Sequence, residues 1–221
     1  MGAHDFSSPT VKTFLETLGS ASPTPGGGTG AAVAGAMGAS LVQMLAELTV
    51  GRKKYAEHEE LMKAIADEAT SEREALLQLA AKDAGAYDGV GAAFKLPKET
   101  DDEKAARRAA IQSALKDACE VPLEVMQHCV HVIGIAKNAV QRGNKNAVSD
   151  GAAGAELARA GMKIASYNVM INLVSIKDEE YVKTARTRMD EMAYMGTAVA
   201  NKIDSHVREM WTAKPASAGG Q

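Results

Sequence analysis

The chain has 221 residues, with 25 lysine and arginine residues against 28 aspartate and glutamate residues, which gives a formal net charge of −3. This balance excludes a strongly basic nucleic-acid-binding protein and a polyacidic tail protein. Hydrophobic residues make up 46% of the chain and aromatic residues only 4%, so the core must consist mainly of alanine, leucine, valine, isoleucine and methionine. As a set, these residues suit helices better than sheets, and we predict an all-α protein.

The cysteine content and the N-terminus both favour a cytoplasmic protein. Cys119 and Cys129 are the two cysteines, and they form neither a disulfide framework nor a CxxC pair. The N-terminal sequence MGAHDF lacks the basic and apolar regions of a signal peptide. The least polar stretch, Gly30–Val50, is interrupted by Gln43 and Glu47, so we predict a buried helix there and no membrane span.

The first part of the chain predicts a short helix, a loop and a helix of small residues. The short helix covers Pro9–Leu18, with Ser8 as its N-cap and Gly19 as its end. Two prolines and three glycines make Ser20–Gly28 a loop. It leads into a helix in which Gly26–Ser40 contains eleven glycine or alanine residues among fifteen. We expect this helix to expose a face of small residues that one subunit cannot fill alone, which predicts a homodimer.

The middle of the chain predicts two long helices. Apolar residues recur at steps of three and four, and they imply one helix that ends near Phe94. Asp101 or Asp102 can cap the next helix, whose apolar series keeps its phase through Pro122. We expect a kink or two abutting helices at this proline. Gln141–Asn146 is a turn by composition.

Two more helices complete the predicted fold. Asp150 opens one of them, and the other runs from about Tyr181 to Met210. We therefore predict a single-domain antiparallel helical bundle of about six to seven helices over residues 1–213. The alanine-, glycine- and serine-rich residues 214–221 are expected to form a disordered tail.

Several polar residues fall on apolar helix faces and are candidates for chemistry. Glu72 and Asp83 share the stripe of the long helix that ends near Phe94, where an acid is costly unless it is paired or used in function. A buried ion pair and a functional acid both remain open for them. Asn168 is in phase with the apolar residues of its helix, so its amide needs partners. Asp150 is either an N-cap or a functional acid.

The glycines and the cations each allow two interpretations. Gly26, Gly27 and Gly28 form either a tight turn with close helix packing or a backbone-lined ligand pocket, since neither the GxxxxGK[ST] nor the GxGxxG pattern is present. Lys53 and Lys54 follow the small-residue helix, where they either stabilise its C-terminus or bind a polyanion.

His128 and His131 share one helix face, but no third ligand is in phase with them on that helix. We therefore predict no metal site.

Five segments, in order along nearly the whole chain, resemble the formimidoyltetrahydrofolate cyclodeaminase family, which also contains stand-alone bacterial methenyltetrahydrofolate cyclohydrolases. The segments are SPTPGGGTGAA (22–32), LTVGRKKY (48–55), Asp83 with AAFKLPK (92–98), GNKNAVSD (143–150) and NVMINLVSIKD (168–178). The resemblance implies an all-helical homodimer that binds folate in a cleft between helices near the subunit contact. It implies a folate substrate, no cofactor, and no nucleic-acid or membrane partner.

The implied reaction needs no metal, because the bridging carbon of 5,10-methenyltetrahydrofolate is already a cationic electrophile. Water adds to this carbon, and collapse of the tetrahedral centre releases 10-formyltetrahydrofolate. We prefer this cyclohydrolase activity because the chain carries no formimidoyltransferase domain. A cyclodeaminase, which closes the ring and releases ammonia, and a non-catalytic folate-binding or oligomerisation module remain alternatives.

The resemblance also suggests a role for each candidate residue. Asp83 is the expected proton-transfer or pterin-anchoring acid, and Asp150 is the expected second acid. Lys53 and Lys54 are expected to bind the glutamate tail, and Asn168 to orient the substrate. The Gly26–Gly28 backbone is expected to line the pocket.

Overall fold

The computed structural model describes residues 10–212, and all of its regular secondary structure is helical. The elements are α1 (Val11–Leu18), α2 (Gly27–Glu47), the short 3-10 helix η1 (Lys53–His58), α3 (Glu59–Phe94), α4 (Asp101–Arg142), α5 (Val148–Leu173) and α6 (Glu179–Thr212). The prediction of an all-α bundle is confirmed. The expected Ser8 cap and the tail at 214–221 lie outside the described residues.

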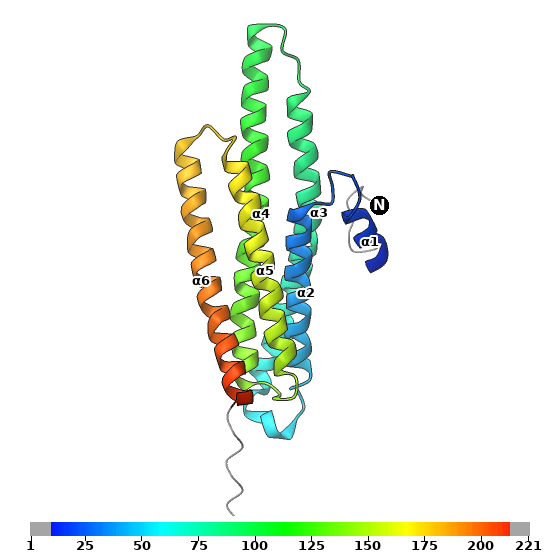
Figure 1. Ribbon diagram of the computed structural model, residues 1–221, viewed down its shortest axis with the longest axis vertical. Coiled ribbons are helices and arrows are strands. Elements are labelled where there is room, and N and C mark those ends of the chain that lie inside the picture. The colour runs from blue at the N-terminus through cyan, green and yellow to red at the C-terminus, as the bar shows by residue number, and fades with distance from the viewer. Residues whose placement is uncertain (1–9, 213–221) are drawn as a thin grey trace, which may run out of the picture.

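Four helices enclose the core, and a fifth covers one side of it (Figure 1). Helices α2, α3, α4 and α5 pack against their neighbours in the bundle, and α6 packs on α4 and α5. Helix α1 stands beside the start of α2 and buries none of its residues. The α3–α4 hairpin extends beyond the other helices, so α2 begins part-way along α3. This difference in length leaves room for a cavity where α2 starts.

Two helix starts differ from the predictions, and side-chain hydrogen bonds explain both. Helix α1 begins at Val11, where the Thr10 hydroxyl accepts a hydrogen bond from the Thr13 N–H at 3.1 Å. Helix α4 is capped by Thr100 and not by Asp101 or Asp102. Thr100 is the cap because the Glu103 carboxylate, three residues later, accepts a hydrogen bond from the Thr100 N–H at 3.0 Å, which completes a capping box.

Asp150 does not open α5. The helix begins at Val148, with Ala147 at the cap position, and Asp150 lies in the first turn. The interpretation of Asp150 as an N-cap is therefore wrong. An acid in the first turn still interacts favourably with the positive end of the helix dipole.

Helices α2 and α5 cross with their backbones almost in contact. A methyl group added at Gly38 would lie 2.6 Å from the Gly154 carbonyl oxygen, and one added at Gly161 would lie 2.6 Å from the Ala31 carbonyl oxygen. No larger residue fits at these points without moving the backbone. The small-residue face of α2 is therefore filled inside the subunit, and the prediction that it is exposed is wrong.

Some larger apolar residues at α2 lie on its exposed side, whereas Val42 and Leu45 are fully buried in the bundle. Met37 is 54% exposed, and Met44 and Leu48 are also exposed. By length and composition α2 could span a membrane, and 56% of its most apolar window is buried in the protein. Its small residues pack on other helices of the bundle, as predicted for a buried core helix.

Helix α4 continues through Pro122 as a single element, so the expected pair of abutting helices is wrong. Proline has no N–H, and the Ala118 carbonyl four residues earlier loses its partner within the helix. The Asn172 side chain of α5 donates a hydrogen bond to this carbonyl at 2.9 Å. A bond between two helices thus replaces the missing bond within one helix.

This replacement predicts a coupling between Asn172 and Pro122. Asn172→Ala leaves the Ala118 carbonyl without its donor, which we expect to lower the unfolding free energy by about 1–3 kcal/mol. The loss should be smaller in a Pro122→Ala background, because the backbone N–H that this substitution restores can donate to the same carbonyl. A double-mutant cycle by urea denaturation measures the coupling. Additive effects of the two substitutions would contradict this account.

Candidate active site

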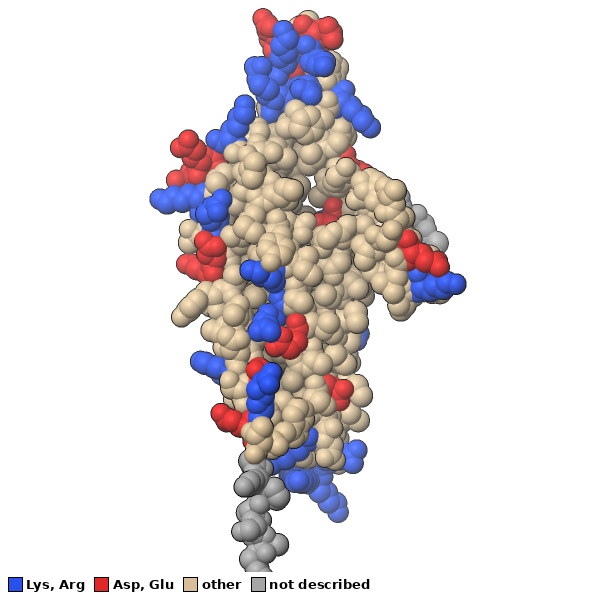
Figure 2. All heavy atoms as spheres, in the orientation of Figure 1, with Lys and Arg blue, Asp and Glu red and all other residues tan. Residues whose placement is uncertain are grey.

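A cavity of ≈ 340 Å³ lies where α2 begins, between α3, α4 and α5. Figure 2 shows the hollow on the face of the molecule that carries α2 and α5, with acidic atoms inside it. The loop before α2 and the first residues of α2 form one wall. The other lining residues come from the three neighbouring helices and are Asp83, Ala86, Tyr87, Val90, Leu115, Ala118, Asn168, Ile171 and Asn172. The cavity is within the size range of small-molecule sites.

Asp83 points toward the N-terminus of α2. Its Oδ2 accepts a hydrogen bond from the Thr29 hydroxyl at 3.0 Å, and the Thr29 backbone N–H also bonds to the carboxyl. The positive end of the α2 dipole adds to this stabilisation of a negative charge. Burial acts in the other direction and is the larger effect, so the pKa of Asp83 is raised above its usual value of 3.8.

The Asp83 carboxylate has hydrogen-bond donors but no cation beside it. Among residues 10–212, the groups that act on it are the two Thr29 donors and the surrounding apolar atoms. The prediction left open whether Asp83 belongs to a buried ion pair, and this arrangement excludes that alternative for the described residues. A half-buried carboxylate with a raised pKa in a cavity is suited to proton transfer and to binding a cationic ligand.

Gly28 is required for this arrangement. A methyl group at Gly28 would lie 2.2 Å from Asp83 Oδ1 and 2.6 Å from its Cγ. The absence of a side chain therefore allows the carboxylate to reach the helix N-terminus. Close packing and a backbone-lined cavity thus occur at the same place, and the binding of a ligand by these glycines stays a prediction.

Asn168 lines the same cavity, across from the start of α2. Its amide nitrogen donates to the Ile164 carbonyl of its own helix at 3.0 Å, which fixes the direction of the side chain. The structure thus brings together Asp83, Asn168 and the Gly26–Gly28 backbone in one cavity.

The remaining predicted site residues lie in a different place. Lys53, Lys54 and Asp150 line a cavity of ≈ 650 Å³ at the other end of α2, together with Arg52 and Lys145. A 21-residue α-helix separates the two cavities, and at 1.5 Å per residue its length is about 30 Å. Within one subunit these residues therefore do not share a site with Asp83.

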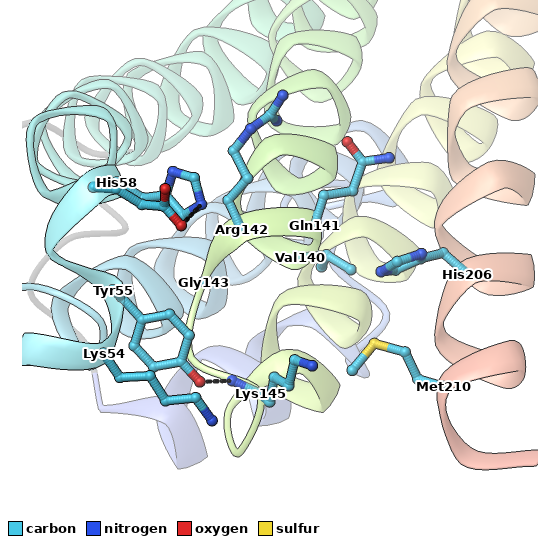
Figure 3. A pocket seen from close by; sticks show the side chains of 11 residues that line it. Lys54, Tyr55, His58, Val140, Gln141, Arg142, Gly143, Lys145, His206 and Met210 are labelled. Atoms are coloured by element: carbon cyan, nitrogen blue, oxygen red, sulfur yellow. Dashed lines mark hydrogen bonds and ion pairs between the residues drawn. The ribbon is translucent and has the colours of Figure 1, made fainter. Parts of the chain in front are cut away.

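The end of the bundle that carries Arg52, Lys53, Lys54 and Lys145 is the basic end of the molecule. Hydrogen bonds from the turn between α4 and α5 hold it together. The Lys145 N–H donates to the Tyr55 hydroxyl at 3.0 Å, and the Asn144 N–H donates to the Thr49 hydroxyl at 2.8 Å. Figure 3 shows a second hollow beside it, of ≈ 290 Å³, which is lined by Lys54, Arg142 and Lys145, with the Arg142 side chain pointing away from the two lysines. Cations thus gather at this end of the bundle.

Glu72 is the acid that serves as a buried ionic partner. Its Oε2 lies 2.7 Å from His128 Nδ1, and its Oε1 lies 3.3 Å from His131 Nδ1. Glu68, one turn earlier on α3, lies 3.0 Å from His131 Nε2. The sequence identified the two histidines and Glu72 as separate candidates but did not pair them and did not point to Glu68, because the carboxylates and the histidines lie on different helices. No three histidine, cysteine, aspartate or glutamate side chains between residues 10 and 212 are arranged to hold a metal ion.

The Glu72–His128 pair predicts a pH-dependent stability. The hydrogen bond with Glu72 raises the pKa of His128 above 6.5, against the opposing effect of burial. The stabilisation is fully present below the unfolded-state pKa and is lost as the pH rises through the higher folded-state pKa. We expect the melting temperature to fall more steeply for the wild type than for Glu72→Gln as the pH rises above about 6.5. Equal slopes in the two proteins would contradict this prediction.

Neither cysteine is suited to act as a nucleophile. Burial raises the pKa of Cys129 to about 12, and burial also raises the pKa of Cys119. The thiolate is the reactive form of cysteine, so both residues are core residues.

Three further residues in or beside the cavity were not predicted. Thr29 holds Asp83, Tyr87 forms part of the rim and is 56% exposed, and Asn172 binds the Ala118 carbonyl. Asn172 could have been found, because it follows Asn168 by four residues and therefore lies on the same helix face. Tyr87 carries no comparable signal in the sequence.

Comparison with known proteins places this architecture in a family. The sequence pattern of the formiminotransferase-cyclodeaminase family matches residues 10–191. The chain belongs to the formiminotransferase-cyclodeaminase family. The resemblance stated from the sequence segments is thereby confirmed.

Two relatives of different chain length align with most of this chain. The chain is 40% identical over 199 residues to a methenyltetrahydrofolate cyclohydrolase of Methylorubrum extorquens, a match that covers 90% of this chain and 96% of that protein. It is 30% identical to the formimidoyltransferase-cyclodeaminase of Rattus norvegicus over 83% of this chain, but this corresponds to only 34% of the rat protein.

The crystal structure of formiminotetrahydrofolate cyclodeaminase from Thermotoga maritima has the same fold. It superimposes with a TM-score of 0.84 at 29% identity and covers 92% of this chain and 98% of that one.

Proposed function

We propose that this protein is a methenyltetrahydrofolate cyclohydrolase, which hydrolyses 5,10-methenyltetrahydrofolate to 10-formyltetrahydrofolate. The observation that carries the proposal is the Asp83 carboxylate, which lies in a cavity with two hydrogen-bond donors and, among the described residues, no protein cation beside it. A cationic methenyl group supplies the missing positive charge. The similarity to the Methylorubrum extorquens cyclohydrolase along nearly the full length of both chains supports this choice.

The proposed reaction moves two protons and consumes one water. Water adds to the cationic bridging carbon, and Asp83 accepts a proton from the water as the carbon becomes tetrahedral. The bond from this carbon to N5 then breaks, N5 takes up a proton, and the formyl group remains on N10. One proton is released to solvent in the net reaction. The raised pKa of Asp83 makes its carboxylate a stronger base and its carboxyl a usable donor.

The other cavity residues position the substrate in this proposal. Asn168 orients the pterin, and the Gly26–Gly28 backbone lines the pocket beside it. Lys53 and Lys54 bind the glutamate tail and Asp150 acts as the second acid, and because these three residues line the cavity at the other end of α2, both roles require a second subunit. We propose that no metal and no cofactor take part, because the bridging carbon is already cationic. Activity that is abolished by EDTA and restored by zinc would contradict this.

A cyclodeaminase is the second candidate, and the Thermotoga maritima structure favours it. In that reaction N10 attacks the formimidoyl carbon and ammonia leaves, so the same carboxylate could transfer the proton. The third candidate is a non-catalytic folate-binding or oligomerisation module.

Two parallel assays separate these functions. In the first, methenyltetrahydrofolate absorbance is followed with protein and corrected for spontaneous hydrolysis. Loss faster than the blank supports the cyclohydrolase, whereas a spectral shift without loss supports a binding module. In the second, the protein is mixed with 5-formimidoyltetrahydrofolate, and release of ammonia identifies a cyclodeaminase.

We also propose that the protein is a cytoplasmic homodimer. The α2/α5 apolar face supports the dimer and consists of Met37, Met44, Leu48, Tyr167 and Ile171, which are all exposed in the subunit. An exposed apolar patch of this kind on a soluble bundle indicates a protein interface.

The proposed homodimer can be tested by its mass in solution and by substitutions that should separate the two subunits. We expect light scattering at micromolar concentration to give about twice 23.1 kDa. The double substitution Met37→Asp/Met44→Asp should give the monomer mass, since charges on the face resist burial. A monomer mass for the active wild-type protein would contradict the proposal.

A further inference from the structure

Two asparagine side chains of α5 line the Asp83 cavity, one helical turn apart. Asn168 lies across from the start of α2, and a methyl group added at Gly27 would lie 3.8 Å from its amide nitrogen. Asn172 follows one turn later, so the two residues are displaced by about 6 Å along the helix axis. Most other side chains in the lining are apolar, so these amides are among the few polar groups that a ligand meets there.

Hydrogen bonds to backbone carbonyls fix which end of each amide is already in use. The Asn168 nitrogen donates to the Ile164 carbonyl at 3.0 Å, and the Asn172 nitrogen donates to the Ala118 carbonyl at 2.9 Å. A carbonyl oxygen can only accept, so the group that faces it must be the amide nitrogen and not the amide oxygen. The two amide oxygens are therefore the ends left for other partners.

The two amide oxygens are unpaired and accessible. Neither oxygen has a hydrogen-bond partner among residues 10–212. Within the same part of the chain, no side-chain nitrogen or oxygen is both buried and unpaired, so both oxygens are open at the wall of the cavity. Each oxygen has two lone pairs, whereas each nitrogen has one N–H left. The two asparagines thus offer a ligand mainly hydrogen-bond acceptors.

Pro122 makes Asn172 the more firmly oriented of the two asparagines. The Ala118 carbonyl receives no hydrogen bond from the proline four residues later, so the Asn172 amide replaces that donor. If this amide turned around, its oxygen would face the carbonyl oxygen, and both groups would lose a partner. The Ile164 carbonyl, in contrast, can also accept from the Asn168 backbone N–H inside α5. The free carbonyl of α4 therefore holds the Asn172 oxygen available for a ligand.

Acceptors of this kind suit a ring whose edge carries N–H groups. The pyrimidine ring of a folate has an N–H at N3 and an amino group at C2, and both need acceptors once binding removes their water. In the proposed function, the Asp83 carboxylate faces the cationic methenyl group and is not available for this edge. Asp83 is the one carboxylate among the described lining residues, so the Asn168 and Asn172 oxygens are the side-chain amide acceptors that remain.

We propose that Asn172 binds the amino-pyrimidine edge of the folate through its amide oxygen, together with Asn168, in an orientation held by the carbonyl that Pro122 leaves free. The proposal rests on the proposed function for the class of ligand and adds a recognition residue to it. Asn172 then determines specificity, because a ring without these N–H groups leaves the oxygen unpaired. Neither asparagine transfers a proton, so substitution of Asn172 should raise KM and leave kcat almost unchanged.

A Pro122→Ala background separates ligand binding from stability. There the restored backbone N–H can serve the Ala118 carbonyl, so loss of Asn172 no longer leaves that carbonyl without a donor. Folic acid affinity is measured by calorimetry for the wild type, Pro122→Ala and Pro122→Ala/Asn172→Ala. We expect the first two to agree within about threefold and the double variant to bind about tenfold to a hundredfold more weakly. Equal affinity of Pro122→Ala and the double variant would overturn the proposal, because Asn172 would then have a structural role alone.

A ligand without the amino group tests the recognised edge directly. The 2-desamino analogue of folic acid lacks the donors at C2. It should bind Pro122→Ala at least about tenfold more weakly than folic acid does, and this difference should shrink to about threefold or less in Pro122→Ala/Asn172→Ala. The same difference in both proteins would show that Asn172 does not contact this edge and would overturn the proposal.

Gln112→Ala is the matched control for a lost contact between helices. Gln112 joins α4 to the residues after α5, with bonds to the Ser175 carbonyl at 3.1 Å and from the Lys177 N–H at 2.7 Å, and it is not part of the cavity lining. This substitution should lower stability and leave folic acid affinity unchanged. An equal loss of affinity in Gln112→Ala would attribute the effect to helix packing and would also overturn the proposal.

Failure of the proposed function gives a different result. A wild-type protein that binds folic acid but leaves methenyltetrahydrofolate unchanged is not a cyclohydrolase, and the affinities of the variants still decide the role of Asn172. A wild-type protein that hydrolyses methenyltetrahydrofolate, with affinities that do not depend on Asn172, keeps the function and loses the recognition residue. Absence of folic acid binding by the wild type would overturn the proposed ligand edge as well.

Discussion

Asp83→Asn is expected to lower kcat by about a hundredfold or more while the protein remains folded. Asparagine keeps the size of the side chain and part of its hydrogen bonding to Thr29 but cannot accept the proton from water. Burial raises the pKa of Asp83, so the stability of the folded state falls as the pH rises from the unfolded-state pKa through the higher folded-state pKa. We therefore expect the melting temperature of Asp83→Asn at neutral pH to equal or exceed that of the wild type.

The matched control is Asp67→Asn, an exposed aspartate on the same helix and outside the cavity. It should change neither turnover nor melting temperature. Wild-type kcat and KM in Asp83→Asn would show that the site is wrongly assigned. A lowered melting temperature with normal turnover would assign Asp83 a structural role.

Gly28→Ala is expected to displace the same carboxylate without removing it. The added methyl would lie 2.2 Å from Asp83 Oδ1, and the end of a side chain is the atom that can move most easily. The carboxylate then loses its hydrogen bonds with Thr29 and its place in the cavity. We expect kcat to fall by about tenfold to a hundredfold, with the helical circular dichroism spectrum unchanged.

Gly30→Ala is the control for this substitution, two residues further along α2. Among the described residues, no atom outside its own stretch of helix lies within 4 Å of the methyl that it adds. Alanine is the better helix former by about 0.5–1 kcal/mol, so Gly30→Ala should raise the melting temperature and leave turnover unchanged. Equal turnover in the Gly28→Ala and Gly30→Ala proteins would contradict the close contact between Gly28 and Asp83.

The helices were predictable because their apolar residues recur regularly over long stretches. Phe94 ends α3 as expected, and the series around Pro122 identified α4 despite the proline. The helix starts were less predictable, since Thr100, Asp101 and Asp102 are consecutive residues that can all cap. Glu103 distinguishes Thr100 from the other two, because it stands three residues after Thr100.

The orientation of α2 and part of the site could not be obtained from spacing. In α2 both the small and the large residues recur every three or four positions, so the pattern does not show which set faces inward. The close backbone contact with α5 decides this. Likewise, the stripe on α3 identified Asp83 and Glu72 as unusual acids but not their partners. Thr29 and His128 come from other helices, and the packing of the helices sets their positions along the bundle axis.

The two walls of the Asp83 cavity differ in how they are held in place. The glycine contacts between α2 and α5 fix one wall, whereas the opposite wall can vary. They join backbone to backbone, so they fix the level at which α2 begins, and with it the position of Thr29, whose hydroxyl donates to the Asp83 carboxylate. The opposite wall consists of side chains such as Tyr87, Val90 and Leu115, on helices that continue beyond α2. Substitution there reshapes the space around the ligand without moving the acid. One helical frame can therefore keep a proton-transfer group in place while selection adapts the pocket to a different substrate.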